Sequence, residues 1–239
     1  MCSRTCVSVI LVASISGCLA AGSKDLVLRR RIGVDQPGTV VRETVYYWSD
    51  TRRVADDPRF RTIFDRSAKT VTVVDKSNRT YYVRTFDDLL RMRETLRKRF
   101  ESLSLDDRKS WGLDERVTLT PTGQSEKIAG YEANEYQIDG GPIGGTVWIA
   151  EGIKTGTEWP DWEKIEATVG SAGYAGRQLA EAINQLGGFP VRTSMKFTVA
   201  GRPESAVAEV VEVRKMSLPP EMLAIPDRFE KVPAPPLPR

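Results

Sequence analysis

A regular alternation of apolar and polar residues near the end of the chain constrains its fold more than any other feature. Between residues 191 and 199 every even-numbered residue is polar, and the odd-numbered residues are mainly apolar. A period of two residues is that of a β-strand with one buried face. The turn-like segment 200–203 then leads into a second strand-like run at 206–216. The two runs predict a long antiparallel hairpin.

Residues favoured in β-strands recur in several other segments. Val, Thr and aromatic side chains dominate these segments, and polar or glycine-rich stretches separate them. The stretch 76–79 suits the tight turn of a hairpin, and the glycines between 140 and 145 suit a turn between antiparallel strands. No Gly-Lys-Ser/Thr follows those glycines, which argues against a phosphate-binding loop. The expected strands are 38–48, 60–64, 69–75, 80–84, 127–138 and 146–150.

Two segments have the periodicity of helices instead. Over 86–103 apolar residues recur every three or four positions, and acidic residues in the first turn complement the helix dipole. Helical sequence over 161–186 ends at Gly187-Gly188 and Pro190, the usual order at the end of a helix. Strands and helices arranged in this way predict an α+β fold. Residues 18–37 are expected to hold a tether and a first strand, 38–229 one domain, and 230–239 a proline-rich tail.

The first 18 residues have the pattern of a bacterial lipoprotein signal. A weakly basic start is followed by an apolar stretch and by the small pair Ser16-Gly17 before Cys18. This pattern predicts a signal peptide over 1–17 and a lipid on Cys18. An uncleaved membrane span is disfavoured, because serines and glycines interrupt the apolar run and a span needs about 20 predominantly apolar residues. Ordinary secretory cleavage, with 18–20 as a small-x-small site, stays open.

A lipid on Cys18 places the expected protein in the bacterial cell envelope. The other two cysteines, Cys2 and Cys6, precede it, so its thiol has no disulfide partner in the mature chain. Acylation at this position anchors the protein to a membrane and leaves its body facing the periplasm. Leu19 stands where an aspartate would favour the inner membrane, and the outer membrane is therefore the expected address.

The residues needed for many common catalytic sites are missing. The chain has no histidine, and all three cysteines stand at or before residue 18. Histidine triads, cysteine nucleophiles, and histidine or cysteine metal sites are therefore excluded from the mature chain. Adjacent acidic pairs at 56–57, 87–88 and 106–107 fit turns and helix starts better than catalytic carboxylates. We expect a protein that is not an enzyme and that has no metal, cofactor or nucleic-acid partner.

Two pairs of segments resemble an uncharacterised family of bacterial envelope lipoproteins. The first pair joins 63–75 to 78–82, and the second joins 127–133 to 147–150. Their pattern is similar to that of the lipoprotein-carrier superfamily typified by LolA and LppX, and the resemblance spans most of 40–229. It implies an unclosed, mainly antiparallel half-barrel. In that fold helices cover the concave face, which often encloses an apolar cavity for acyl chains or a lipoprotein.

The expected function follows from the anchor and the resemblance together. A tethered half-barrel predicts a non-enzymatic envelope protein that binds a hydrophobic ligand or a lipidated partner. The alternative is a protein-interaction or envelope-sensor module without a lipid ligand. In that case the uneven charge of the chain would guide docking of the partner. Residues 24–100 carry 19 Lys and Arg against 11 Asp and Glu, whereas residues 101–239 carry 15 Lys and Arg against 21 Asp and Glu. The aromatic residues expected to line a ligand site are Trp48, Tyr131, Trp148 and Phe197.

Overall fold

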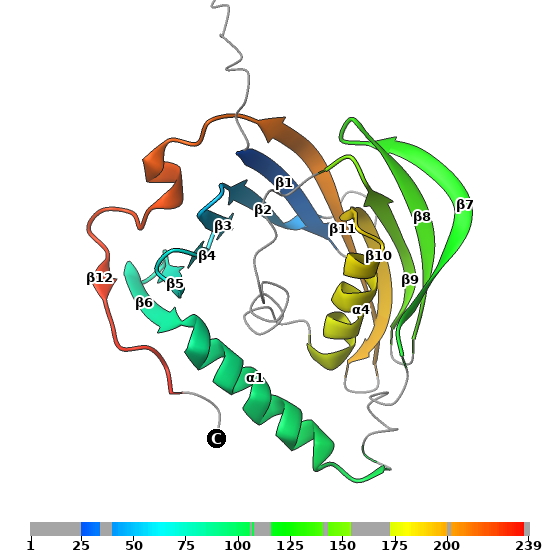
Figure 1. Ribbon diagram of the computed structural model, residues 1–239, viewed down its shortest axis with the longest axis horizontal. Coiled ribbons are helices and arrows are strands. Elements are labelled where there is room, and N and C mark those ends of the chain that lie inside the picture. The colour runs from blue at the N-terminus through cyan, green and yellow to red at the C-terminus, as the bar shows by residue number, and fades with distance from the viewer. Residues whose placement is uncertain are drawn as a thin grey trace, which may run out of the picture.

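One twelve-stranded sheet dominates the part of the chain that the structure describes (Figure 1). The structure is a computed structural model, and it describes residues 25–33, 40–105, 107, 116–140, 143–153, 173–199 and 202–236. The first six strands are β1 (Leu26–Gly33), β2 (Val40–Trp48), β3 (Arg52–Asp56), β4 (Phe60–Asp65), β5 (Thr70–Asp75) and β6 (Thr80–Thr85). The other six are β7 (Thr118–Ile128), β8 (Tyr131–Gly140), β9 (Ile143–Ala150), β10 (Phe189–Val199), β11 (Arg202–Lys215) and β12 (Glu230–Lys231).

The sheet is strongly curved, and its two edges do not join. The strand order is β12-β6-β5-β4-β3-β2-β1-β11-β10-β9-β8-β7. All neighbouring strands in this order are antiparallel except β12, which runs parallel to β6. Figure 1 shows the strands as an open arc with β12 and β7 at opposite ends. The expected hairpin near the end of the chain is the pair of β10 and β11, which lies in the middle of this arc.

The α+β class predicted from the sequence is wrong. More than half of the described residues lie in the strands of one mixed, unclosed sheet. The described helices are α1 (Phe86–Glu101), α4 (Gly173–Gln185) and the short 3-10 helix η1 (Pro220–Leu223). Long strands account for the difference, since β7, β10 and β11 have 11, 11 and 14 residues. The helices cover parts of a large sheet, and the fold is mainly β.

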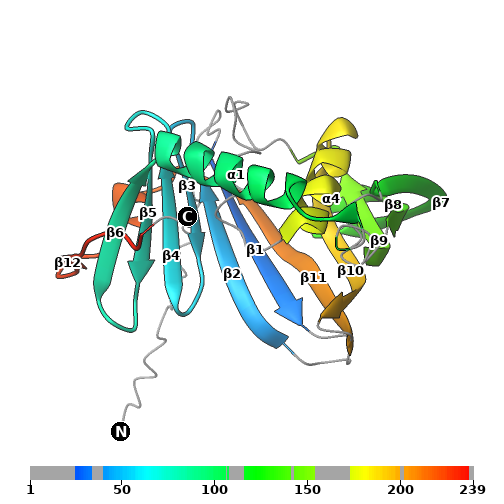
Figure 2. The same cartoon turned by 90° about the horizontal axis from the view of Figure 1, so that it is seen from below.

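Helix α1 lies on the inner side of the arc at its β4–β6 end (Figure 2). It occupies the segment for which the sequence predicts a helix over 86–103. Leu89 of the helix packs against Phe64 of β4 and Val71 of β5, and all three side chains are buried. Apolar residues at three- and four-residue spacing therefore face the sheet, and the charged residues of the helix face outward.

Helix α4 lies on the same side of the sheet, at its β8–β10 end (Figure 1). Its residues Leu179 and Ile183 are buried against Val147 and neighbouring apolar residues of β8 and β9. It corresponds to the later part of the helix expected over 161–186, of which 161–172 lies outside the described residues. An ion pair of 3.8 Å between Arg93 of α1 and Glu181 of α4 links the two helices across the open side of the arc.

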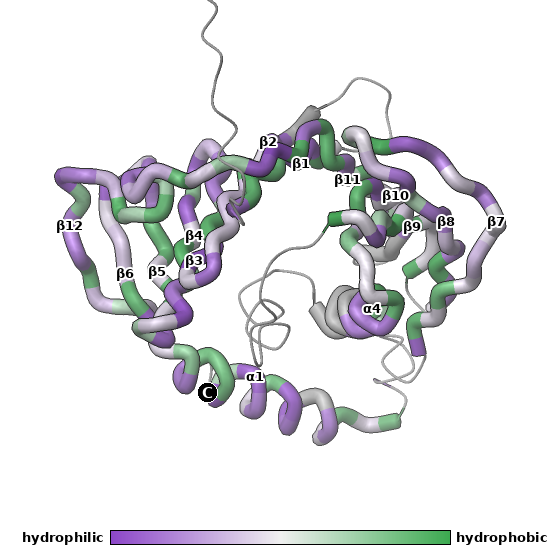
Figure 3. Tube along the Cα trace, turned by 45° about the horizontal axis from the view of Figure 1, so that its top comes forward, coloured by the Kyte–Doolittle hydropathy of each residue, from purple (hydrophilic) through white to green (hydrophobic). Residues whose placement is uncertain are grey.

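The end of the chain covers the outer side of β3–β6. Figure 3 shows hydrophobic and hydrophilic residues alternating along these strands, and the apolar residues that point outward pack under the C-terminal segment. β12 adds to the edge of β6, where the backbone N–H of Val232 donates to the carbonyl of Tyr81 at 2.9 Å. The proline-rich segment expected over 230–239 thus begins as an edge strand. The outer cluster consists of Val54, Ile63 and Val74 with Tyr47, Tyr81, Leu223, Ile225 and Phe229.

Candidate functional site

Strand pairing traces one continuous inner face, starting beneath α1. Phe64, which packs against α1, pairs with Arg53 of β3, and Arg53 pairs with Trp48 of β2. Directly paired residues in an antiparallel sheet point to the same side. Every second residue of β2 from Trp48 therefore shares this face, which includes Tyr46 and Thr44.

The same face continues to the strands beneath α4. Arg30 of β1 pairs with Thr44 on one side and with Val210 of β11 on the other. Ala208, which stands two residues before Val210 on β11, pairs with Thr193 of β10. Thr193 in turn pairs with a β9 residue that is packed under α4. The face beneath α1 and the face beneath α4 are therefore one surface, the concave face of the arc.

The middle of this concave face is the candidate site. Among the described residues, the apolar clusters beneath α1 and α4 contain none from β1, β2, β3 or β11. These four strands lie between the two helix-covered ends of the sheet. The partly buried apolar residues that they present to the concave side are Ile32, Tyr46, Ala55, Ala206 and Val213, of which Tyr46 and Val213 also pack against the cluster that contains Leu28.

Three of the four aromatic residues expected in the site belong to one apolar cluster. Trp48 and Trp148 are each 8% exposed, and Tyr131 packs against the same group of buried residues. The ring of Phe189 meets that of Trp48 edge-on, with 5.3 Å between the ring centroids. Trp48 therefore forms part of the core at one end of the concave face. Tyr131 lies at the β7–β8 turn, away from the central strands.

The other two aromatic residues to place are Trp148 on β9 and Phe197 on β10. Trp148 follows Val147 on β9, so its side chain points away from α4 and packs in the cluster that also contains Trp48. The guanidinium of Arg192 lies over the indole of Trp148, 5.7 Å from the ring centroid. Phe197 belongs to β10 and pairs with Ile143, but its side chain is outside the described part of the chain.

Arg192 is held by carboxylates on the outer face. It donates two hydrogen bonds to Glu126, at 2.7 and 3.1 Å, and one to Glu209 at 3.1 Å. The hydrogen bonds to Glu126, and then the charge and hydrogen bond of Glu209, raise the pKa of Arg192 above its ordinary value despite partial burial. This bidentate arrangement connects β7, β10 and β11.

Three consecutive arginines of β1 differ in their partners. Arg29 and Arg31 point to the outer face, where both lie close to Glu43, at 3.5 and 3.1 Å. Arg29 also lies 3.6 Å from Glu212. Arg30 points to the concave face, and its side chain makes no hydrogen bond or ion pair with any residue that the structure describes. The sequence analysis did not single out Arg30, because only strand pairing separates it from its neighbours.

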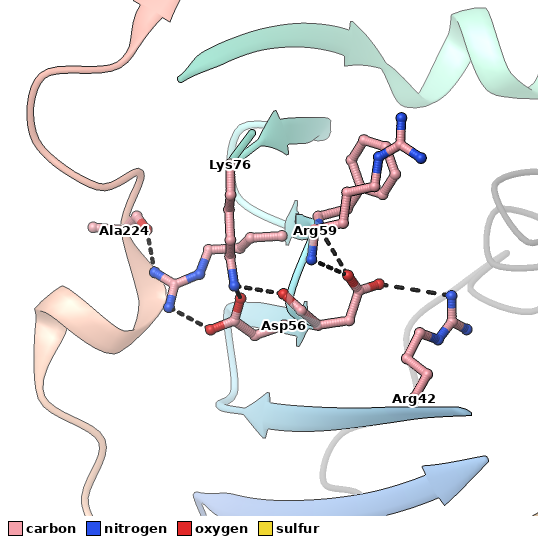
Figure 4. A network of polar contacts seen from close by, with 8 residues as sticks. Arg42, Asp56, Arg59, Lys76 and Ala224 are labelled. Atoms are coloured by element: carbon pink, nitrogen blue, oxygen red, sulfur yellow. Dashed lines mark hydrogen bonds and ion pairs between the residues drawn. The ribbon is translucent and has the colours of Figure 1, made fainter. Parts of the chain in front are cut away.

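Asp56 belongs to a polar network on the outer face, and Asp57 extends this network to Arg42 of β2 at 3.7 Å (Figure 4). Asp56 binds Arg61 through one oxygen at 2.7 Å and Lys76 through the other at 2.5 Å. Arg61 also donates to the carbonyl of Ala224 at 3.1 Å, which fastens the C-terminal segment to the sheet. Burial alone raises the pKa of Asp56, but the hydrogen bonds and charges of Arg61 and Lys76 outweigh it. The pKa of Asp56 is lowered from 3.8.

The other acidic residues of these pairs complete turns and helix starts. Asp57 accepts hydrogen bonds from the backbone N–H groups of Arg59 and Phe60, at 2.8 and 2.7 Å. Asp88 and Thr85 exchange two hydrogen bonds, of 3.2 and 3.1 Å, as a capping box at the start of α1. Asp107 receives a bond of 2.6 Å from the hydroxyl of Ser104, and Asp106 is outside the described residues.

Metal-binding groups and membrane-spanning helices are both missing from the described residues. Within the described ranges, no three or more His, Cys, Asp or Glu residues are grouped so that they could hold a metal ion. None of the helices described there is long and apolar enough to cross a membrane. The expected signal peptide at 1–17 and Cys18 lie outside the described residues.

Known proteins with a similar chain trace share little sequence with this chain. No curated protein matches the chain. Among solved structures, PNGF-II in space group C2 aligns with a TM-score of 0.42 and 12% identity, over 88% of this chain and 31% of that one. The chain thus spans about a third of the length of PNGF-II. An uncharacterized conserved protein from Thermus thermophilus aligns with a TM-score of 0.42 and 10% identity, over 89% and 91% of the two chains.

A family model covers most of the chain directly. The model of a domain of unknown function, DUF4412, matches residues 50–229. This range begins just before β3 and ends just before β12, and it includes α1 and α4. The chain belongs to the DUF4412 family.

Proposed function

We propose that this protein is a non-enzymatic binding protein of the bacterial envelope that holds a hydrophobic ligand, or the lipid of a lipidated partner, on the concave face of its sheet. In this proposal Cys18 carries a lipid that anchors the protein to a membrane, with the outer membrane as the expected address. The sheet forms the body of the binding site, and α1 and α4 flank it.

The observation that carries the proposal is the middle of the concave face. Its four central strands present apolar side chains that neither described helix packs against. Ligand sites are typically concave and mainly apolar, with a few polar groups that fix orientation. A curved sheet on which the two described helices α1 and α4 pack at the ends fits that description.

Two features of the sequence support the proposal as well. The lipobox-like pattern before Cys18 favours export, and the resemblance to the lipoprotein-carrier superfamily favours a site for acyl chains. The acidic pairs described above support a role other than catalysis, because Asp56, Asp57 and Asp88 serve ion pairs, a turn and a helix start.

Neighbouring residues of β11 allow a matched test of the site. Ala206 points to the concave face and Val207 to the outer face, and both are partly buried. We expect the neutral probe N-phenylnaphthylamine to fluoresce on binding to the purified mature protein. Ala206→Phe places a ring in the site and should weaken this binding severalfold. Val207→Phe adds comparable bulk on the outer face and should bind as the wild type does.

The outcomes distinguish the hydrophobic-ligand proposal from its alternative, a protein-interaction or envelope-sensor module. Wild-type protein that binds neither the probe nor co-purifying lipid in native mass spectrometry contradicts the hydrophobic-ligand proposal. Equal loss of binding in Ala206→Phe and Val207→Phe, with unchanged thermal unfolding, places the binding elsewhere. A lipid-free protein that captures an unlipidated protein partner favours the interaction or sensor module.

The anchor is tested separately by metabolic labelling with a fatty acid. Wild-type protein should take up the label and remain with the membrane fraction. A Cys18→Ser variant should lose both properties, and a variant that is still labelled would contradict the lipid attachment. Because the body of the protein is unchanged in this variant, probe binding should persist.

A further inference from the structure

We propose that Arg30 and Thr44 form an anion subsite within the concave face, which takes the acidic head of an amphiphilic ligand. The ligand class is a long apolar chain with a carboxylate or a phosphate at one end. The inference rests on the proposed function, because it names the kind of hydrophobic ligand that the same face takes.

The first observation is the pairing of the two residues. Arg30 and Thr44 lie directly opposite each other on β1 and β2, both on the concave face. Side chains of directly opposed residues start about 5 Å apart at their Cβ atoms, which brings a guanidinium and a hydroxyl within reach of one small anion. Arginine presents several N–H donors in a planar fork that suits carboxylate and phosphate oxygens.

The second observation is that both groups have unused hydrogen-bonding capacity. Thr44 is only 4% exposed, and its hydroxyl has no hydrogen-bond partner among the residues that the structure describes. The Arg30 side chain is partly buried and has no hydrogen bond or ion pair with any described residue. Buried polar groups normally have partners, since each one left without a partner costs free energy. An anion held between them supplies the missing acceptor for Arg30 and for the Thr44 hydroxyl.

The third observation is the charge of the surrounding face. None of the concave-facing neighbours of the pair on β1, β2 and β11 is acidic; these neighbours are Leu28, Ile32, Arg42, Tyr46, Ala208 and Val210. Arg42 lies 3.7 Å from Asp57, which follows β3. The outer face differs, because Arg29 and Arg31 on either side of Arg30 in the sequence both lie close to Glu43. Arg42 thus has an acidic partner of its own, whereas Arg30 has none among the described residues and lies beside apolar side chains. That combination suits an amphiphile with an acidic head.

The test compares ligands that share a chain and differ in the head. Palmitate and hexadecanol each compete with N-phenylnaphthylamine for the purified mature protein. We expect the wild type to prefer palmitate, and Arg30→Gln to weaken palmitate binding about tenfold or more, because hydrogen bonds to charged groups are among the stronger ones. Hexadecanol should bind both proteins equally, which also shows that the variant is folded. Arg31→Gln removes the same charge from the outer face of the same strand and should leave both ligands unaffected.

Thr44→Val probes the second group of the subsite. It removes the hydroxyl and keeps the branched shape, so palmitate binding should weaken about threefold, as expected for one hydrogen bond. Hexadecanol binding should stay unchanged. Wild-type palmitate binding in this variant would overturn the assignment of Thr44.

Inorganic phosphate distinguishes a lipid head from a free anion. If phosphate raises the melting temperature of the wild type and not of Arg30→Gln, the subsite also takes free anions. If phosphate has no effect while the palmitate preference depends on Arg30, the subsite serves only the head of an amphiphile. The inference is overturned if Arg30→Gln keeps the palmitate preference of the wild type. Failure of hexadecanol and of N-phenylnaphthylamine to bind the wild type would instead overturn the proposed function.

Discussion

Arg30 on the concave face differs from the paired arginines of the outer face. On the outer face, Arg61 is paired with Asp56, and Arg192 is paired with Glu126 and Glu209. On the concave face, Arg30 has no carboxylate partner among the described residues. Charged groups withdrawn from water are costly unless they are paired. The outer arginines therefore stabilise the fold, whereas the donors of Arg30 have no acceptor among the described residues, as the proposed anion subsite requires.

The two faces also differ in what covers them. The outer side of β3–β6 is closed by the end of the chain, and Arg61 takes part by binding the carbonyl of Ala224. On the concave side, α1 and α4 pack on the two ends of the sheet. Polar groups on the outer face thus join segments that are far apart in the sequence. Substitutions of single residues separate these two roles.

The largest expected effect is the loss of the Arg61 side chain. Arg61→Met keeps much of the apolar stem but leaves the largely buried Asp56 carboxylate with one cation fewer and Ala224 without its donor. We expect the free energy of unfolding to fall by about 2–3 kcal/mol. Chemical denaturation measures it. The matched variant Arg30→Met should lie within about 0.5 kcal/mol of the wild type, and an equal loss in both variants would contradict the comparison.

The second largest effect is expected at Thr44, where substitution should raise the stability of the fold instead of lowering it. Thr44→Val removes a buried hydroxyl that has no partner among the described residues, so the ligand-free protein should become more stable by about 1 kcal/mol. Thermal unfolding of delipidated protein measures the change. Thr44→Ser keeps the hydroxyl and should show no gain. A loss of stability in Thr44→Val would mean that the hydroxyl is satisfied in the free protein.

A smaller effect is the pH dependence of the stability that the ion pairs of Asp56 contribute. The pKa of Asp56 is lowered in the folded protein, so its ion pairs stabilise the fold fully above the ordinary carboxyl pKa of 3.8. This contribution is lost as the pH falls below that value, because the folded state must then take up a proton against the charges of Arg61 and Lys76. Asp56→Asn should therefore be less stable than the wild type at neutral pH, and the difference should shrink in acid. Unfolding measured across that pH range checks the sign.

The smallest effect is expected at an exposed outer pair. Arg31 is about half exposed, with 51% of its side chain accessible, and its contact with Glu43 is screened by water. Arg31→Gln should change the free energy of unfolding by less than about 0.5 kcal/mol. A larger change in chemical denaturation would show that exposed pairs of the outer face also carry stability.

Much of the strand pattern was predictable because it depends on local sequence. The expected hairpin of 69–75 and 80–84 corresponds to β5 and β6, and its turn is fixed by Asp75, which accepts hydrogen bonds from Ser77 and Asn78. The alternation at 191–199 corresponds to β10. β3 was missed because it is five residues long and has adjacent arginines where apolar residues are expected.

The fold class and the site depend on contacts between distant segments. The joining of all twelve strands into one sheet places β1 beside β11 and β12 beside β6, and neither pairing has a signature in the sequence. In the sequence Arg30 is one of three consecutive arginines that nothing distinguishes, and pairing with Thr44 is what sets it on the concave face. Trp148 seemed equivalent to Trp48, yet strand register places it on the other side of the sheet from Val147.

The most direct test of the central claim is photo-crosslinking with a palmitate that carries a diazirine along its chain. The labelled residues, mapped by mass spectrometry after proteolysis, should fall on the concave side of β1, β2 and β11, at Ile32, Tyr46 and Ala206. Their neighbours on the outer face, Val45 and Val207, should remain unlabelled. Labels concentrated on the outer cluster at Leu223 and Ile225, or spread equally over both faces, would contradict a binding role for the concave face.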